Sequence, residues 1–206
     1  EMAIGAEHRT SFLVAPANGQ LPDLTPAAKA ARADRLAAYP RGLGFQRGDH
    51  PESFTLAERC LRDYGSLLGP PMMPVGYNNN YQIIQSPDHV VIVVEMNHDA
   101  RVIPLNAEHK PAALNKYLGD SIGWWEGDTL VVETTHLREY PYMRRLPNSE
   151  NATTTARFTL EERTNDKGEK VKYLNNVMTL TDPLLYTQPV TVTSSLRWSP
   201  DTPIME

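Results

Sequence analysis

The chain is poor in the residues that most metal sites and disulfide frameworks require. It has one cysteine, Cys60, and six histidines in 206 residues. One cysteine cannot form a disulfide within these residues, and a structural zinc site usually draws on several Cys and His ligands. Neither a His-x-His pair nor a His-Glu-x-x-His motif occurs. We therefore expect no metal and no cofactor.

Long apolar runs, glycine-rich loops and basic clusters are also missing. The mean hydropathy is -0.45, and no stretch is apolar enough over sufficient length to span a bilayer. The sequence has no P-loop and no nucleophile elbow. The net charge is -5 with scattered Lys and Arg, which argues against nucleic acid as a partner. The expected partner is a small-molecule ligand or substrate, and an oligomer is compatible with the sequence.

Proline, in contrast, is plentiful, with 17 residues against 12 glycines. Many prolines lie in the first 75 residues, which we predict to form an extended arm and helices that pack on the rest. The best helix runs from Thr25 to Tyr39, because Thr25 is a good N-cap and Pro26 fits the first helical position. A second, shorter helix is predicted between Phe54 and Gly65.

From Asn80 onward, short apolar runs alternate with turn signals. About eight such runs follow one another, with no helical pattern between them, as expected of an antiparallel meander. The run from His89 to Asn97 is apolar on both faces until Glu95, which is typical of a central, covered strand. We predict a mostly β domain over residues 76–206 that closes into a lipocalin-like, calycin-type barrel. The alternative is a two-sheet β-sandwich.

The segment EMNHDAR, residues 95–101, is the strongest catalytic candidate. His98 is the predicted acid or base, with Asp99 or Glu95 as its partner. Arg101 is the predicted anchor for an anionic or carbonyl group. The competing interpretation is a solvated turn with an ion pair between Asp99 and Arg101.

Polar and aromatic residues elsewhere are candidates for the lining of a pocket. The run YNNNY precedes the first predicted strand and also suits turn chemistry, because Asn tolerates left-handed backbone. A hairpin about as long on each arm would bring this run close to residues 95–101. Asparagines are disfavoured in strands, so one of two adjacent ones near residue 175 must face inward or occupy a bulge. The predicted pocket residues are Tyr77, Asn79, Asn80, Tyr81, Trp125 and Asn176.

Glu133 and His136 are a further pair of titratable residues in the predicted strand TLVVETTHL. Strict alternation places their side chains on opposite faces. We therefore predict a solvent-facing Glu133 and a packed His136 that do not act together.

The motifs GPPMMPVGYNNNYQIIQSPDHVVIVVEMNHDARVIPL and YLGDSIGWWEGDTLVVETTHL together resemble a group of exported bacterial hypothetical proteins. The resemblance covers nearly the whole chain. It implies Sec-type export and a periplasmic or secreted location, and it implies no particular activity or catalytic residues. Members of the group continue past Glu206 into a short segment with a second cysteine. The resemblance therefore suggests the hypothesis that Cys60 is half of a disulfide in a longer chain.

Two functions follow as expectations. The first is a cofactor-independent acid–base enzyme, of lyase, isomerase, cyclase or hydrolase type, acting on a small, partly apolar organic molecule inside the barrel. The alternative is a non-catalytic periplasmic protein that binds a lipophilic ligand. An enzyme should place at least two titratable groups within hydrogen-bond reach of each other inside the cavity, whereas a binding protein can line it with apolar and amide groups only. A third option is an interaction domain with a filled barrel.

Overall fold

The computed structural model describes residues 11–38, 59, 61, 69, 72–73, 76–112, 114–139 and 146–204. Cys60 and most of the predicted helix between Phe54 and Gly65 lie outside these residues. The described part is mostly β-structure, with one α-helix, α1 (Pro26–Ala38), and a single 3-10 turn, η2 (Met96–His98).

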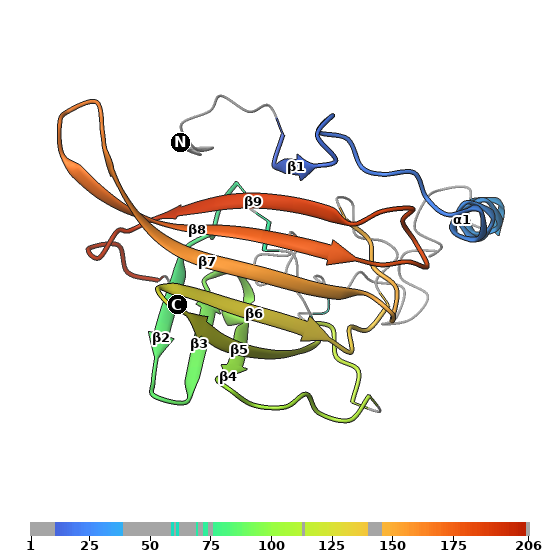
Figure 1. Ribbon diagram of the computed structural model, residues 1–206, viewed down its shortest axis with the longest axis horizontal. Helices are drawn as coiled ribbons and strands as arrows, with labels where there is room; N and C mark the ends of the chain where they lie inside the picture. Colours follow the sequence, from blue (N-terminus) through green and yellow to red (C-terminus); the bar gives the residue numbers. More distant parts are fainter. Residues whose placement is uncertain are drawn as a thin grey trace.

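The strands form two antiparallel sheets (Figure 1). The larger sheet has the order β1-β9-β8-β7-β6-β5, and the smaller one has the order β2-β3-β4. In Figure 1 the strands of the smaller sheet run across those of the larger one. The bounds in the larger sheet are β1 (Leu13–Ala15), β5 (Asp120–Glu126), β6 (Thr129–Thr135), β7 (Thr153–Thr164), β8 (Lys170–Thr181) and β9 (Val190–Arg197). Those in the smaller sheet are β2 (Tyr81–Gln85), β3 (His89–Val94) and β4 (Ala100–Pro104).

The core lies between the two sheets. Strand alternation places one set of side chains from each sheet in this layer, because successive side chains point to opposite faces. The smaller sheet contributes Val90, Ile92 and Ile103, and the larger sheet contributes residues such as Phe158 and Met178. The mostly β, antiparallel prediction is confirmed. The sheets do not close into a barrel among the described residues, so the two-sheet arrangement fits the alternative prediction.

β3 is less covered than its sequence suggests. Val90, Ile92 and Val94 are buried, whereas Val91 and Val93 are only partly buried. These two residues lie on the outer face of the smaller sheet, where Ile84 and Val102, the partners of Val91, have exposed side chains. The strand is central in its sheet, as predicted, but only one of its faces lies in the core.

The N-terminal segment is attached to the larger sheet. β1 pairs with β9, and Thr25 N donates to Leu185 O at 2.9 Å. Thr25 also caps α1 as predicted, since its Oγ1 accepts from Ala28 N at 3.1 Å. No helix among the described residues is both long and apolar enough to cross a membrane. The domain boundary near residue 75 stays a prediction.

Candidate functional site

The beginning of β2 and the end of β3 meet, as the sequence predicted. Glu95 is buried and its Oε2 accepts from Asn80 Nδ2 at 3.0 Å and from Asn80 N at 3.3 Å. Glu95 N donates to Asn80 O at 3.0 Å, which extends the β2–β3 ladder by one pair. The asparagine therefore closes the strand end and holds a buried carboxylate in place.

The remaining residues of the predicted catalytic segment diverge. His98 is exposed and has left-handed backbone, with φ at 49°, at the end of η2. Asp99 Oδ1 accepts from the neighbouring Ala100 N at 3.0 Å, which is a local turn contact. Arg101 is buried in the core. The structure does not test their predicted catalytic roles, which stay predictions.

Arg101 is buried against hydroxyl groups of the larger sheet. Its Nε donates to Ser121 Oγ at 3.0 Å and its Nη2 donates to Thr134 Oγ1 at 2.6 Å. The two hydroxyls are themselves 2.9 Å apart. Ser121 and Thr134 are paired residues on β5 and β6, and Thr134 pairs in turn with Thr154 on β7. A row of three core-facing hydroxyls thus lies opposite one buried guanidinium. We call these four residues the Arg101 row.

Two predicted pocket residues lie on the same core-facing side of the larger sheet. Asn176 is buried, which confirms that one of two adjacent asparagines faces inward, and its Oδ1 has no hydrogen-bond partner among the described residues. Thr154 Oγ1 is likewise buried without a partner. Trp125 shares this face with Leu130, its partner on β6, but stays 44% exposed at the end of β5. Tyr77 and Asn79 are exposed ahead of β2, where Tyr81 begins the strand.

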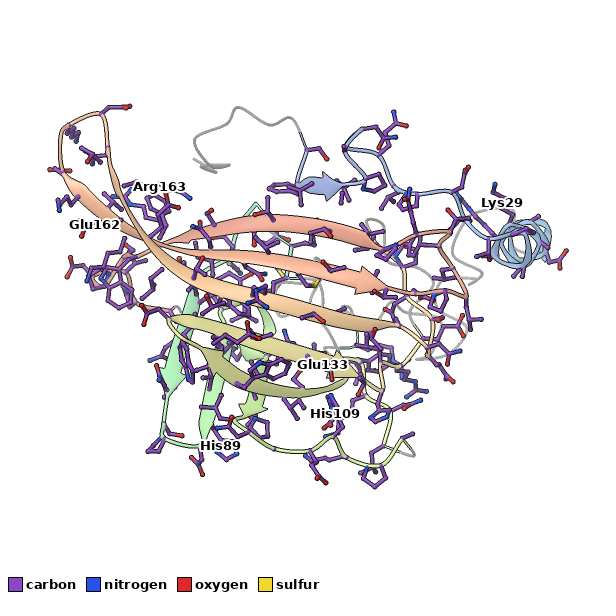
Figure 2. The ribbon with its side chains drawn as sticks, viewed as in Figure 1. Lys29, His89, His109, Glu133, Glu162 and Arg163 are labelled. Atoms are coloured by element: carbon purple, nitrogen blue, oxygen red, sulfur yellow. The ribbon has the colours of Figure 1, made fainter. Side chains whose placement is uncertain are left out.

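A second cluster, which the sequence reasoning missed, lies on the outer face of the larger sheet. His109, in the loop between β4 and β5, contacts two carboxylates. Its Nδ1 is 3.0 Å from Asp120 Oδ2, and its Nε2 is 3.0 Å from Glu133 Oε1. The ring of His136 meets that of His109 edge to face, with centroids 6.0 Å apart. Figure 2 shows the labelled His109 and Glu133 close together beside β5 and β6. We call Asp120, His109 and Glu133 the histidine–carboxylate chain.

Two backbone features assemble this cluster. Gly119 has φ at 69°, and a Cβ there would lie 2.6 Å from Thr134 Cγ2 and 2.7 Å from Thr135 O. Only glycine therefore lets the chain enter β5 so close to β6 and present Asp120. His136 has φ at 52°, which ends the alternation of β6. Its ring consequently lies near that of His109, whose Nε2 contacts Glu133 Oε1, so both residues border the same imidazole.

The three members of the chain differ in exposure and in the constraints on them. The side chains of Asp120, His109 and Glu133 are 10%, 19% and 42% exposed. Asp120 Oδ2 also accepts from Lys110 N at 2.8 Å. Burial raises the pKa of Asp120, but the bond from Lys110 N, the bond to His109 and the nearby positive charges lower it more, so the net pKa lies below its usual value. Asp120 is thus a fixed carboxylate, whereas Glu133 can turn toward solvent.

Both ring nitrogens of His109 face carboxylate oxygens. A neutral imidazole donates from one nitrogen only, so two ionised carboxylates are both satisfied only when His109 carries both ring protons. The chain then holds a proton donor, His109 Nε2, beside an exposed proton acceptor, Glu133. His109 lies only 11 residues before Asp120 in the sequence, which is a weak signal for the histidine–carboxylate chain. The contact between the two side chains nevertheless depends on how the β4–β5 loop folds.

Within the described residues, no group of three or more His, Cys, Asp or Glu side chains could hold a metal ion. Comparison of the chain with protein-family models, with curated proteins and with solved structures finds no match. The function is therefore inferred from the geometry of this chain alone.

Proposed function

We propose that the protein is a cofactor-independent acid–base enzyme that transfers protons at the histidine–carboxylate chain. The observation that carries the proposal is one imidazole held between two carboxylates at 3.0 Å on each side. Such clusters of mutually interacting titratable groups are concentrated at functional sites. The class of reaction is the one expected from the sequence, but the proton-transfer residues differ from the predicted set around His98.

The roles follow from burial. Asp120 is nearly buried and anchored by Lys110 N, so it orients the imidazole and stabilises its positive charge. Glu133 is exposed and accepts a proton from a substrate carbon next to a carbonyl group. His109 Nε2 donates a proton to the oxygen that gains the electron pair. One proton is taken and one is delivered, which gives an isomerisation, or an elimination when a leaving group departs.

The test uses exchange of substrate protons with solvent, because deuterium incorporation can be detected without identifying the product. The protein is incubated in D₂O with a library of small carbonyl compounds and organic acids, and incorporation of deuterium is measured by mass spectrometry. We expect at least one compound to exchange with the wild type and to lose exchange with His109→Gln and with Glu133→Gln. Glu162→Gln, at an exposed residue of the β7–β8 hairpin that lies away from His109 in Figure 2, is the matched control.

The same assay separates the two candidate centres. If His98→Ala abolishes exchange while His109→Gln retains it, the segment predicted from the sequence is the site and the present proposal is overturned. Thermal melting of each variant distinguishes lost chemistry from lost folding. Absence of exchange for every compound with the wild type also counts against the proposal.

A second function is favoured by apolar side chains on the core-facing side of the larger sheet, beyond the buried core. Leu160 is 76% exposed and Trp198 is 64% exposed. They adjoin the cross-strand pair Leu174 and Leu196, both only partly buried. Apolar patches of this kind mark ligand or partner sites. The candidate is a lipophilic-ligand binding protein, periplasmic or secreted, with the two sheets closed around the ligand in a lipocalin-like manner.

Binding of the dye 1-anilinonaphthalene-8-sulfonate tests this second function. We expect Leu160→Lys to weaken binding several-fold because it places a charge in the patch. Leu184→Lys is the control, since Leu184 is also exposed but lies in the loop between β8 and β9. Equal loss in both variants, or no binding by the wild type, contradicts the binding function.

A further inference from the structure

β2 is an edge strand of the smaller sheet. β2 pairs with β3 on one side, and among the described residues no strand pairs with its other side. Ile83 and Ile84 are 43% and 47% exposed, although they point to opposite faces of the sheet. An apolar pair exposed on both faces of an edge strand is a template for pairing with another strand. In Figure 1, β2 lies at the left margin of the smaller sheet.

The backbone of β2 has a fixed hydrogen-bonding pattern. Glu95 N donates to Asn80 O and Ser86 N donates to His89 O, so positions 80 and 86 bond toward β3. In an antiparallel ladder the bonded positions alternate, and the register between them is unbroken. Gln82 and Ile84 therefore also bond to β3, whereas the N–H and C=O groups of Ile83 and Gln85 point to the outer edge.

Charge does not protect this edge. β2 is YQIIQ and contains no Asp, Glu, Lys, Arg or Pro. The free edges of the projecting β7–β8 hairpin, in contrast, carry Glu161, Glu162, Lys170 and Lys172, and Figure 2 labels Glu162 on this arm. Part of β9 is covered by β1. Charged residues and covering strands are the usual means of blocking edge pairing, and the outer edge of β2 has neither among the described residues.

We propose that β2 pairs with β2 of a second copy of this chain, antiparallel and around a two-fold axis at Ile83. Residues that lie directly opposite each other in an antiparallel pair point to the same face of the sheet. When both strands are copies of β2, the sequence numbers of two opposed residues must therefore differ by an even number. The register centred on Ile83 meets this condition. Ile83 then faces Ile83 of the second copy, and Gln82 faces Ile84.

The second copy is the occupant that this edge suits best. Its strand is uncharged, so no like charges oppose one another across the axis. Pairing satisfies the outward backbone groups of Ile83 and covers apolar side chains on both faces of β2. The two smaller sheets join into one antiparallel sheet of six strands, and the larger sheets take no part. This assembly does not depend on the proposed catalytic function.

Cysteine crosslinking tests the register. Ile83→Cys places two thiols directly opposite each other, at the Cα separation of about 5.5 Å that suits a disulfide. Gln85→Cys is the matched control on the same face and edge, because its two copies lie four positions apart, at about 13 Å. We expect oxidation to crosslink Ile83→Cys and not Gln85→Cys. The unmodified protein, with Cys60 alone, gives the background.

Sedimentation equilibrium tests the assembly itself. The wild type should approach twice the chain mass of 23.1 kDa as its concentration rises. Ile83→Lys should raise the dissociation constant at least about tenfold through opposed charges across the axis, with its folding confirmed by circular dichroism. A wild type that stays monomeric at all concentrations, or equal crosslinking of both cysteine variants, overturns the proposal.

Discussion

Single backbone conformations decide how the titratable residues of this protein meet. Gly119 brings the start of β5 against Thr134 and Thr135, and His136 ends β6 in left-handed backbone. Both residues lie within a few positions of the histidine–carboxylate chain. Left-handed backbone is costly for residues other than glycine, and at His136 it accompanies the edge-to-face contact with the ring of His109.

Gly119→Ala is expected to destabilise the fold strongly. The new Cβ would lie 2.6 Å from Thr134 Cγ2, and the alanine would have to adopt a φ of 69°. The steric clash and the left-handed backbone together should lower the free energy of unfolding by about 3 kcal/mol. Gly127→Ala is the matched control, because its φ is 60° but nothing lies within 4 Å. It should cost only about 1 kcal/mol. Urea denaturation of both variants measures the difference, and equal losses would contradict the steric argument.

Asp120 should contribute to the acid sensitivity of the protein. Its pKa is lowered in the folded state despite burial, by Lys110 N and by His109. The resulting stabilisation is present above the ordinary carboxyl pKa of about 3.9 and is lost as the pH falls through the lower, folded value. Asp120→Asn should therefore lose less stability than the wild type between about pH 6 and pH 2. Urea midpoints across this range provide the measurement, and parallel losses would argue against the shift.

Strand pairing creates the second notable feature, the Arg101 row. Ser121, Thr134 and Thr154 come from three consecutive strands and align only through the registers of β5, β6 and β7. Two of the hydroxyls accept from Arg101, and Thr154 Oγ1 is buried without a partner. A buried guanidinium needs hydrogen-bond acceptors, and the row supplies them. Arg101 is thus held inside the protein, and its predicted role as the anchor for an anionic or carbonyl group stays a prediction.

Two valine substitutions in the Arg101 row should change the stability of the protein in opposite directions. Thr134→Val removes an acceptor of the Arg101 guanidinium and should cost about 2 kcal/mol. Thr154→Val removes an unpartnered buried hydroxyl at nearly constant shape and should stabilise by about 1 kcal/mol. The two residues are cross-strand partners, and both are buried, so each is the control for the other. Thermal and urea unfolding give both values, and a destabilised Thr154→Val would indicate a ligand or water that this hydroxyl binds.

Elements that depend on local sequence were predictable. Thr25 is the N-cap of α1, which begins at the next residue, Pro26. The turn at Gly127 joins β5 to β6, as the sequence EGD indicates. The position of Glu95 beside Asn80 followed from equal hairpin arms. The β4–β5 loop was not predictable in this way, because His109 reaches Asp120 and Glu133 only through the folded path of the loop.

At the scale of the whole molecule, the two sheets share one core but leave parts of themselves outside it. The β7–β8 hairpin extends beyond the larger sheet in Figure 1, since β6 pairs with β7 only as far as Phe158. The smaller sheet exposes Ile84 and Val102 on its outer face. The buried core, the exposed apolar side chains of the β7–β8 hairpin and the proposed pairing edge at β2 are therefore different regions of one chain.

Amide hydrogen exchange should reproduce this division. The centres of β7 and β8 are paired on both sides and face the core, so Ala156 and Met178 should exchange slowest. The hairpin tip at residues 165–168 is exposed or nearly so and should exchange fastest. The amide of Ile83 should become more protected as protein concentration rises. Uniform protection across these sites would contradict the two-sheet core.

Local pattern by itself determined the strand-rich character, the principal turns, the first helix and the inward position of one asparagine, because these depend on periodicity, capping and turn chemistry over a few residues. Tertiary structure alone decided that the sheets stack without closing among the described residues, that His109 lies between Asp120 and Glu133, and that Arg101 faces a row of hydroxyls. These contacts join residues 11 to 33 positions apart. Their formation depends on strand register and sheet packing, which no local stretch of sequence encodes.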